Sequence, residues 1–115
     1  MKTKTKEIIW SIFLFFTLLS TGVVEAKQFY KKDVEWLAMN IYHEARNEPV
    51  AGQLAVAHVT INRIESKHYP NTMEKVVTQR WKGICQFSWF CDGKSDVPKN
   101  KKVYDKIYKL AENIL

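Results

Sequence analysis

The sequence is poor in the residues from which most catalytic motifs are built, with two cysteines, three histidines and four glycines. It contains no Gly-rich phosphate loop, no Cys-x-x-Cys pair and no serine or cysteine nucleophile elbow. A zinc protease helix needs two histidines four residues apart around a glutamate, but the fourth residue after His43 is Asn47. These absences exclude the commonest nucleotide-binding, redox and metalloprotease classes, and we expect neither a metal nor a cofactor.

Long apolar runs are also absent, except near the N-terminus. Three early lysines precede an apolar run at residues 8–24, and Val24-Glu25-Ala26 provides the small residues of a signal-peptidase site. We expect residues 1–26 to be either a cleaved signal peptide or an uncleaved N-terminal anchor, with residues 27–115 forming one domain. Both alternatives export the domain to the periplasm, the cell wall or the exterior. Only an uncleaved segment 8–24 would add a membrane as a partner.

Cysteine is scarce, and Cys85 and Cys91 are the only pair. An exported chain meets an oxidising compartment, where a disulfide is favoured over a metal site or a reactive thiol. Closing so short a loop contributes roughly 2 kcal/mol in the chain-entropy model. We therefore predict a disulfide between these two residues.

Positive charge exceeds negative charge, with 18 Lys and Arg against 12 Asp and Glu and a net charge of +6. This balance suits a polyanionic surface such as cell-wall polymer, anionic lipid or nucleic acid. Lysine-rich ends are, however, usually a solvated face. Charge alone names no partner.

Helical periodicity organises the rest of the chain. We predict a helix over residues 34–46 with Asp33 as its N-cap, and a second over residues 50–64 that is apolar around almost its whole circumference. The second helix is predicted to be central, with His58 as a hydrogen-bonded core residue. A short helix capped by Asn71 and a last helix over residues 98–115 follow, separated by an irregular aromatic segment at residues 81–96. The predicted fold class is all-α with one ordered aromatic loop.

Glu44 is the carboxylate with the most suggestive position. It lies in the last turn of the first predicted helix, at the margin of the apolar stripe and half turned toward the core, while His43 points to the far side. Glycoside cleavage needs a carboxylic acid that delivers a proton to the leaving oxygen, and partial burial favours that neutral form. The alternative is a surface glutamate or one paired with Arg46 or Arg63. Helix position alone favours this alternative.

Short motifs across the chain carry a resemblance to a known family. In order, they are Glu44-Ala45-Arg46, Glu48-Pro49, Gly52-Gln53, Ala55-Val56-Ala57, Asn62-Arg63, Pro70-Asn71-Thr72, Gln86-Phe87-Ser88 and Asp92-Gly93. Together they resemble the cell wall hydrolase family typified by the spore-cortex lytic enzymes SleB and CwlJ. The resemblance covers residues 36–96, and its motifs are specific in combination although each alone is weak.

The resemblance implies a lysozyme-like helical domain related to lytic transglycosylases, in which Glu44 matches the catalytic glutamate. In such relatives one glutamate protonates the glycosidic oxygen between N-acetylmuramic acid and N-acetylglucosamine. It then acts as a base while the muramoyl 6-hydroxyl closes a 1,6-anhydro ring. This agrees with the absence of an obvious second carboxylate at the spacing of a two-acid glycosidase.

The matched motifs also suggest substrate-binding residues. Gln86 and Ser88 would hydrogen-bond sugar hydroxyls or N-acetyl groups, and Phe87 and Trp89 would stack on sugar rings. The alternative is that these aromatic residues cover a small core. Arg46 and Asn62 would brace the site, or Arg46 would merely neutralise the C-terminus of its helix.

The expected partner is therefore the glycan strand of peptidoglycan, and no nucleic acid partner is expected. Two rival hypotheses remain open: a non-catalytic peptidoglycan-binding module, and a small membrane-anchored basic envelope protein. Family members usually continue past the last helix into a glycine-containing segment, whereas this sequence ends at Leu115. We accordingly expect a domain that is short at its C-terminus.

Overall fold

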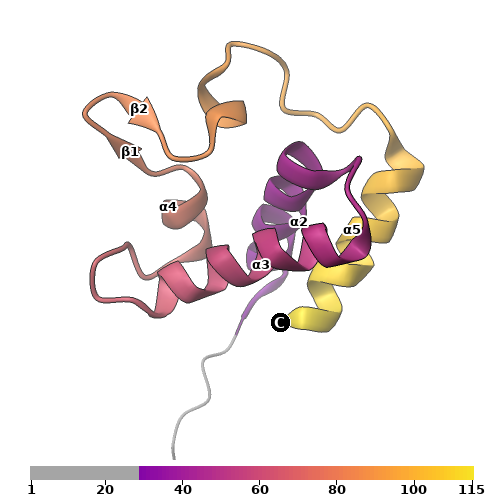
Figure 1. Cartoon of the computed structure of the whole chain (residues 1–115), viewed down its shortest axis with the longest axis horizontal. Coiled ribbons are helices and arrows are strands. Elements are labelled where there is room, and N and C mark those ends of the chain that lie inside the picture. Colours follow the sequence, from indigo (N-terminus) through magenta and orange to yellow (C-terminus); the bar gives the residue numbers. More distant parts are fainter. Residues whose placement is uncertain (1–28) are drawn as a thin grey trace, which may run out of the picture.

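The computed structural model describes residues 29–115, so the predicted signal peptide or anchor lies outside the described residues. The elements in chain order are α2 (Lys31–Ala45), α3 (Val50–Glu65), α4 (Met73–Val77), β1 (Arg80–Trp81), β2 (Ile84–Cys85), the 3-10 helix η1 (Ser88–Cys91) and α5 (Lys101–Ile114) (Figure 1). The predicted all-α class is confirmed, with one small hairpin added. This arrangement is consistent with a lysozyme-like helical domain.

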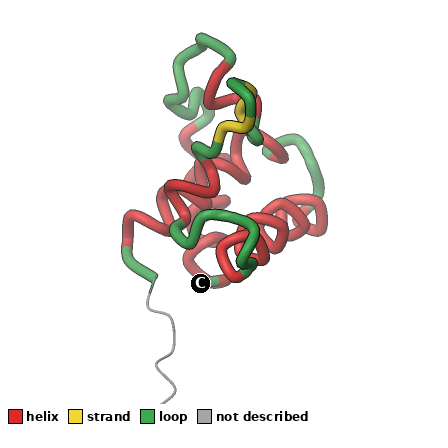
Figure 2. The backbone as a smooth tube through the Cα atoms, turned by 90° about the vertical axis from the view of Figure 1, so that its left-hand side faces the viewer, coloured by secondary structure: helices red, strands yellow, loops and turns green. Residues whose placement is uncertain are grey.

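Helix α2 is the centre of the domain, because α3, α4 and α5 all contact it. Its residues Leu37, Ala38 and Ile41 are fully buried, as the helical spacing of its apolar residues predicts. Figure 2 shows the helices packed together, with the hairpin and its neighbouring loop at one end. The loop next to the hairpin passes over the C-terminal end of α2.

The start of α2 differs from the prediction. The helix begins at Lys31 with Tyr30 as its N-cap residue, so the prediction of Asp33 as N-cap is wrong. Asp33 lies inside the first turn, and its carboxylate accepts a hydrogen bond of 2.8 Å from the Tyr30 backbone N–H. An acidic residue in this position satisfies a free N–H group and complements the positive end of the helix dipole.

The prediction that the second helix is central is also wrong. In α3 only Ala57, Thr60 and Ile64 are buried, whereas Val50 is 58% exposed and Val59 is 46% exposed. His58 is exposed and is not a core residue. A helix that is apolar all round needs partners on all sides, but this small domain packs α3 mainly against α2 and α4.

Two later helices begin at other residues than predicted. The N-cap of α4 is Thr72 rather than Asn71, and the Thr72 hydroxyl accepts from the Lys75 N–H at 3.3 Å. Helix α5 begins at Lys101 rather than at residue 98, because the Asn100 side chain accepts from the Val103 N–H at 3.1 Å. Side-chain oxygens of this kind satisfy the free N–H groups that open a helix.

The segment predicted to be irregular contains a hairpin and a disulfide. Strands β1 and β2 pair antiparallel through the two-residue turn Lys82-Gly83, whose φ angles of 49° and 79° suit the tightest hairpin turns. The predicted Cys85–Cys91 disulfide is confirmed, with Cα atoms 6.0 Å apart. It joins β2 to the end of η1.

Candidate functional site

A polar cavity of about 540 Å³ opens at the C-terminal end of α2. One wall comes from α2 and the residue after it, namely Tyr42, His43, Glu44 and Arg46. The other wall comes from residues 88–100, here called the site loop, which contributes Ser88, Trp89, Asp92, Lys94, Ser95, Val97 and Lys99. We call this space the Glu44 cavity.

A buried hydrogen-bond chain holds the start of the site loop. Trp89 Nε1 donates to Asn40 Oδ1 at 2.9 Å, and Asn40 Nδ2 donates to Thr60 Oγ1 at 3.0 Å. The Thr60 hydroxyl in turn donates to the Val56 carbonyl at 2.8 Å. Because Asn40 and Thr60 are fully buried, each unmade bond would leave a desolvated polar group. The chain therefore fixes η1 against both α2 and α3.

Sequence reasoning missed this network. Asn40 is fully buried, but it lies outside the apolar stripe of α2, on the side of the helix that it shares with Trp36 and His43. A polar side chain in such a place needs a partner, because buried polar groups are nearly always hydrogen-bonded. What the sequence does not reveal is that the partner is Trp89, 49 residues away.

Two further contacts hold the rest of the site loop. The His43 ring stacks on Trp89 with centroids 4.5 Å apart, and its Nε2 lies 2.8 Å from the Asp96 carbonyl oxygen. Since a carbonyl can only accept, Nε2 is the nitrogen that carries the hydrogen. At the end of the loop, the Asn100 N–H donates to the Tyr42 hydroxyl at 3.0 Å. His43 thus lies on the side of α2 away from the apolar stripe, as predicted, and the site loop covers this side.

Glu44 is exposed at the cavity rather than half turned toward the core. The buried side of α2 ends at Ala45, and Glu44 lies just beside it, where the helix meets the open space. Among residues 29–115 the ion pairs are Lys31–Glu35 and Lys32–Glu74, so Glu44 belongs to neither. Its carboxylate is therefore available to a ligand in the cavity.

Both arginines considered as partners of Glu44 make other contacts. Arg46 Nη1 lies 3.5 Å from the Tyr42 carbonyl oxygen and 3.4 Å from that of His43, and its guanidinium lies over the Tyr42 ring. This arrangement supports the interpretation that Arg46 neutralises the C-terminus of α2. Arg63 lies 5.2 Å from the ring centroids of both Tyr69 and Phe87.

The fold brings a second carboxylate, Asp92, to the same cavity. One of its oxygens accepts from the Lys94 N–H at 2.8 Å, which closes a tight turn after η1. The sequence shows no obvious second acid because the two carboxylates come from segments far apart along the chain. The cavity consequently has two acids, Glu44 and Asp92, within a lining that also includes lysines.

The other predicted site residues divide into two groups. Arg46, Ser88 and Trp89 line the Glu44 cavity, although Trp89 is only 6% exposed. Gln86 and Asn62 are exposed but lie outside its lining, and Phe87 is 8% exposed within the hydrophobic core. The burial of both aromatic residues supports the alternative that they cover the core.

Two general features bear on the nature of the site. Within residues 29–115 no cluster of three or more His, Cys, Asp or Glu side chains is placed to hold a metal ion. In the same part of the chain, none of the helices combines the length and apolar character needed to cross a membrane.

Comparison with known proteins identifies similar chains. The family described as Cell Wall Hydrolase matches residues 47–115, so the match begins just after Glu44. The spore cortex-lytic enzyme of Bacillus subtilis is 43% identical over 49 residues, which are 43% of this chain and 16% of that enzyme. The enzyme of the same name from Oceanobacillus iheyensis is 41% identical over 58 residues, 50% of this chain and 21% of the relative.

A third relative, the spore cortex-lytic enzyme of Bacillus cereus, is 43% identical over 47 residues, 41% of this chain and 18% of that enzyme. This chain thus spans about a fifth of the length of the curated relatives it matches. No solved structure matches it.

Proposed function

Because this chain belongs to the cell wall hydrolase family, we propose that its domain cleaves the glycan strands of peptidoglycan with Glu44 as the proton donor. The observation that carries the proposal is the position of Glu44. It lies on a polar cavity, and none of the ion pairs among residues 29–115 includes it. The resemblance of Glu44-Ala45-Arg46 to the family's Glu-Ala-Arg motif implies the same residue.

In the first step, Glu44 gives its proton to the glycosidic oxygen as the bond to the muramoyl carbon breaks. A sugar bound in the cavity excludes water from Glu44, and desolvation favours the neutral acid that can supply this proton. Ser88 and the Arg46 guanidinium offer hydrogen-bond donors to sugar oxygens from opposite walls. These residues orient the substrate, while Glu44 performs the chemistry.

The second step decides the reaction type. In the lytic transglycosylase route, ionised Glu44 takes the proton of the muramoyl 6-hydroxyl, and that oxygen attacks the sugar carbon to form a 1,6-anhydro ring. No water enters this product. We favour this route because the resemblance to lytic transglycosylases implies a single glutamate that performs both proton transfers.

A second candidate, hydrolysis, is favoured by Asp92 on the same cavity. As a general base, Asp92 would activate a water molecule that attacks the sugar carbon, as in two-acid glycosidases. The product would then carry a free reducing end. The two routes therefore differ by one water molecule in the released fragments.

Digestion of purified sacculi followed by mass spectrometry of the soluble fragments tests the proposal. We expect fragments whose muramic acid ends are in the anhydro form. Free reducing ends would instead indicate hydrolysis, with Asp92 as the general base in the second step. Binding to sacculi without any release of fragments would instead support the rival hypothesis of a non-catalytic binding module.

We also propose that residues 1–26 export this domain, so that it acts at the cell wall. The disulfide between Cys85 and Cys91 supports an oxidising compartment. Intact-mass measurement of the exported protein decides between a cleaved signal peptide and an anchor. A mass that includes residues 1–26 would indicate an anchored envelope protein.

A further inference from the structure

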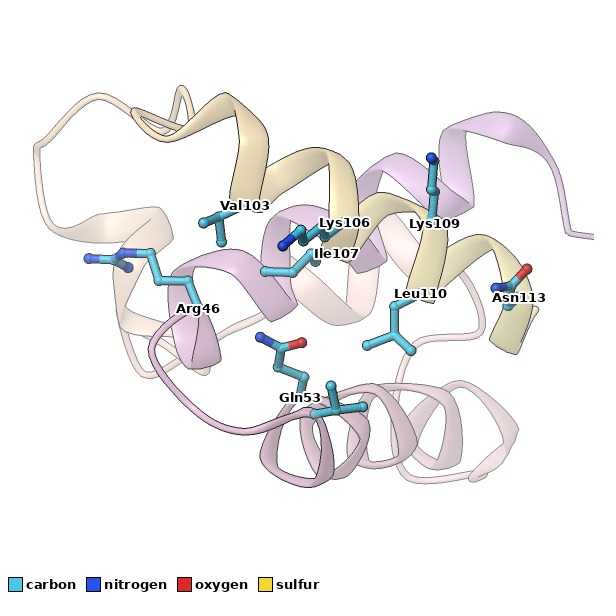
Figure 3. Close-up of a pocket in the computed structure, with 9 residues that line it drawn as sticks. Arg46, Gln53, Val103, Lys106, Ile107, Lys109, Leu110 and Asn113 are labelled. Carbon is cyan, nitrogen blue, oxygen red and sulfur yellow. The ribbon is translucent and has the colours of Figure 1, made fainter.

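A second cavity, of about 450 Å³, lies between the start of α3 and the length of α5. Its apolar lining comes from both helices: Val50 on α3, and Val103, Ile107 and Leu110 on α5. Figure 3 shows Ile107 and Leu110 of α5 directed into the gap near Gln53. We call this space the α3–α5 cleft.

Gln53 offers a hydrogen-bond acceptor at the cleft. Its Nε2 donates to the carbonyl oxygens of Ala45 and Glu48, at 3.3 and 3.4 Å. These bonds use the amide nitrogen and fix the side chain, and they leave Oε1 as the group that a ligand N–H can reach. In Figure 3 this oxygen lies on the side of Leu110, away from Arg46.

The charged residues of the cleft all have one sign. Arg46, Lys106 and Lys109 line it, and neither acidic residue of α5, Asp105 nor Glu112, does. Figure 3 places Lys106 beside Ile107, whereas Lys109 extends away from the gap. The cleft thus suits a ligand with a carboxylate near Lys106 and small aliphatic groups on the apolar side.

The cleft and the Glu44 cavity share Arg46, which lines both. One extended ligand that occupies the Glu44 cavity can therefore continue past Arg46 into the cleft. A glycan strand of peptidoglycan has such a shape, since its muramoyl units carry short peptides with carboxylates and alanine methyl groups.

We infer that the α3–α5 cleft binds the acidic stem peptide of the strand that is cleaved in the Glu44 cavity. This inference rests on the proposed function for the identity of the ligand. The peptide carboxylate pairs with Lys106, and the alanine methyl groups pack on Val103, Ile107 and Leu110. A peptide N–H donates to Gln53 Oε1.

Binding of the free peptide tests the inference without any turnover. The probe is the stem peptide released from sacculi by an amidase, titrated into the full chain carrying Glu44→Gln and followed by NMR or calorimetry. We expect saturable binding that Lys106→Glu weakens about tenfold, because a favourable charge contact becomes a repulsive one. Lys101→Glu, on the same helix but outside the cleft, is the matched control and should bind as before.

Three outcomes would overturn the inference. The first is no binding of the peptide. The second is an equal loss of affinity in the Lys106 and Lys101 variants. The third is equally tight binding of a short polyphosphate, since that would show a general polyanion surface.

Turnover separates this inference from the proposed function. The wild type should release fragments faster from intact sacculi than from glycan stripped of peptides, and Lys106→Glu should reduce this ratio several-fold. An unchanged ratio with normal turnover would refute peptide binding in the cleft and leave the proposed function standing. Peptide binding by a protein that cleaves neither substrate would refute the proposed function and leave the cleft assignment standing.

Discussion

The two walls of the Glu44 cavity are built in different ways. Helix α2 is held by a continuous stripe of buried apolar residues that contacts α3, α4 and α5. The site loop contributes only Trp89 and the partly buried Phe90 to the core, and it is held by side-chain contacts at Asn40, His43 and Tyr42. The α2 wall thus depends on buried apolar surface area, whereas the site loop depends on a few individual side-chain contacts. Substitutions at these bonds should open the cavity while the helices persist.

Asn40→Ala should have the largest effect on stability. It removes the acceptor of Trp89 Nε1, which leaves a buried indole N–H without a partner, and it removes the donor to Thr60, whose hydroxyl keeps only its bond to the Val56 carbonyl. We expect a loss of about 3 kcal/mol in the free energy of unfolding, measured by urea denaturation. Asn62→Ala, at an exposed position on α3, should change stability by less than about 0.5 kcal/mol.

The same variant distinguishes the two walls. In Asn40→Ala, amide hydrogen exchange should accelerate in the site loop more than in α2. Equal acceleration in both segments would mean that the loop and the helix do not differ as described.

Replacing both cysteines by serine should have the next largest effect. The Cys85–Cys91 disulfide closes a short loop, and its loss should cost about 2 kcal/mol in the chain-entropy model. Because the bridge joins β2 to the end of η1, near-ultraviolet circular dichroism should change while the helical far-ultraviolet signal is largely kept. Unchanged stability after reduction would show that Trp89 alone fixes this end of the loop.

Tyr42→Phe tests the contact at the other end of the site loop. The change removes the hydroxyl that accepts from the Asn100 N–H and leaves the buried ring in place. We expect a loss of about 1 kcal/mol, with faster exchange of the Asn100 amide. Protection of that amide at the wild-type level would show that the hydrogen bond does not hold the loop.

High pH should lower the stability of the fold only weakly, and it should do so through the helices rather than through the site loop. Burial, followed by the nearby charge of Glu35, raises the pKa of Tyr104 on α5 above its ordinary value of 10.0. The folded state therefore favours the neutral phenol, and this contribution to stability is complete below pH 10 and lost as the pH rises through the folded-state pKa. Tyr104→Phe should reduce the loss of stability above pH 10, whereas Tyr30→Phe, at an exposed position, should not.

Helical periodicity predicted the helices, because a buried stripe on α2 or α5 is visible in the spacing of apolar residues. It failed for α3, where nearly every side is apolar and the sequence does not reveal which side finds a partner. The exposed Val50 and Val59 are the result. Propensity and pattern describe a helix, but its neighbours decide what is buried.

The candidate site was predictable in part. Glu44, Ser88 and Arg46 were predicted from short motifs, and the structure places them on one cavity. Asp92 and the Asn40–Trp89 bond could not be predicted, because both depend on contacts between segments far apart along the chain. Such contacts become visible only once the site loop is placed over α2.

The most direct test of the central claim is the rate at which Glu44→Gln lyses purified sacculi. The amide is nearly isosteric and Glu44 is exposed, so the fold should be kept, while loss of proton transfer should lower the rate by about 10² to 10⁴. Glu48→Gln, in the adjacent turn and outside the cavity, should lyse at close to the wild-type rate. Lysis by Glu44→Gln at the wild-type rate would contradict the account, and a loss confined to Asp92→Asn would identify Asp92 as the acid instead.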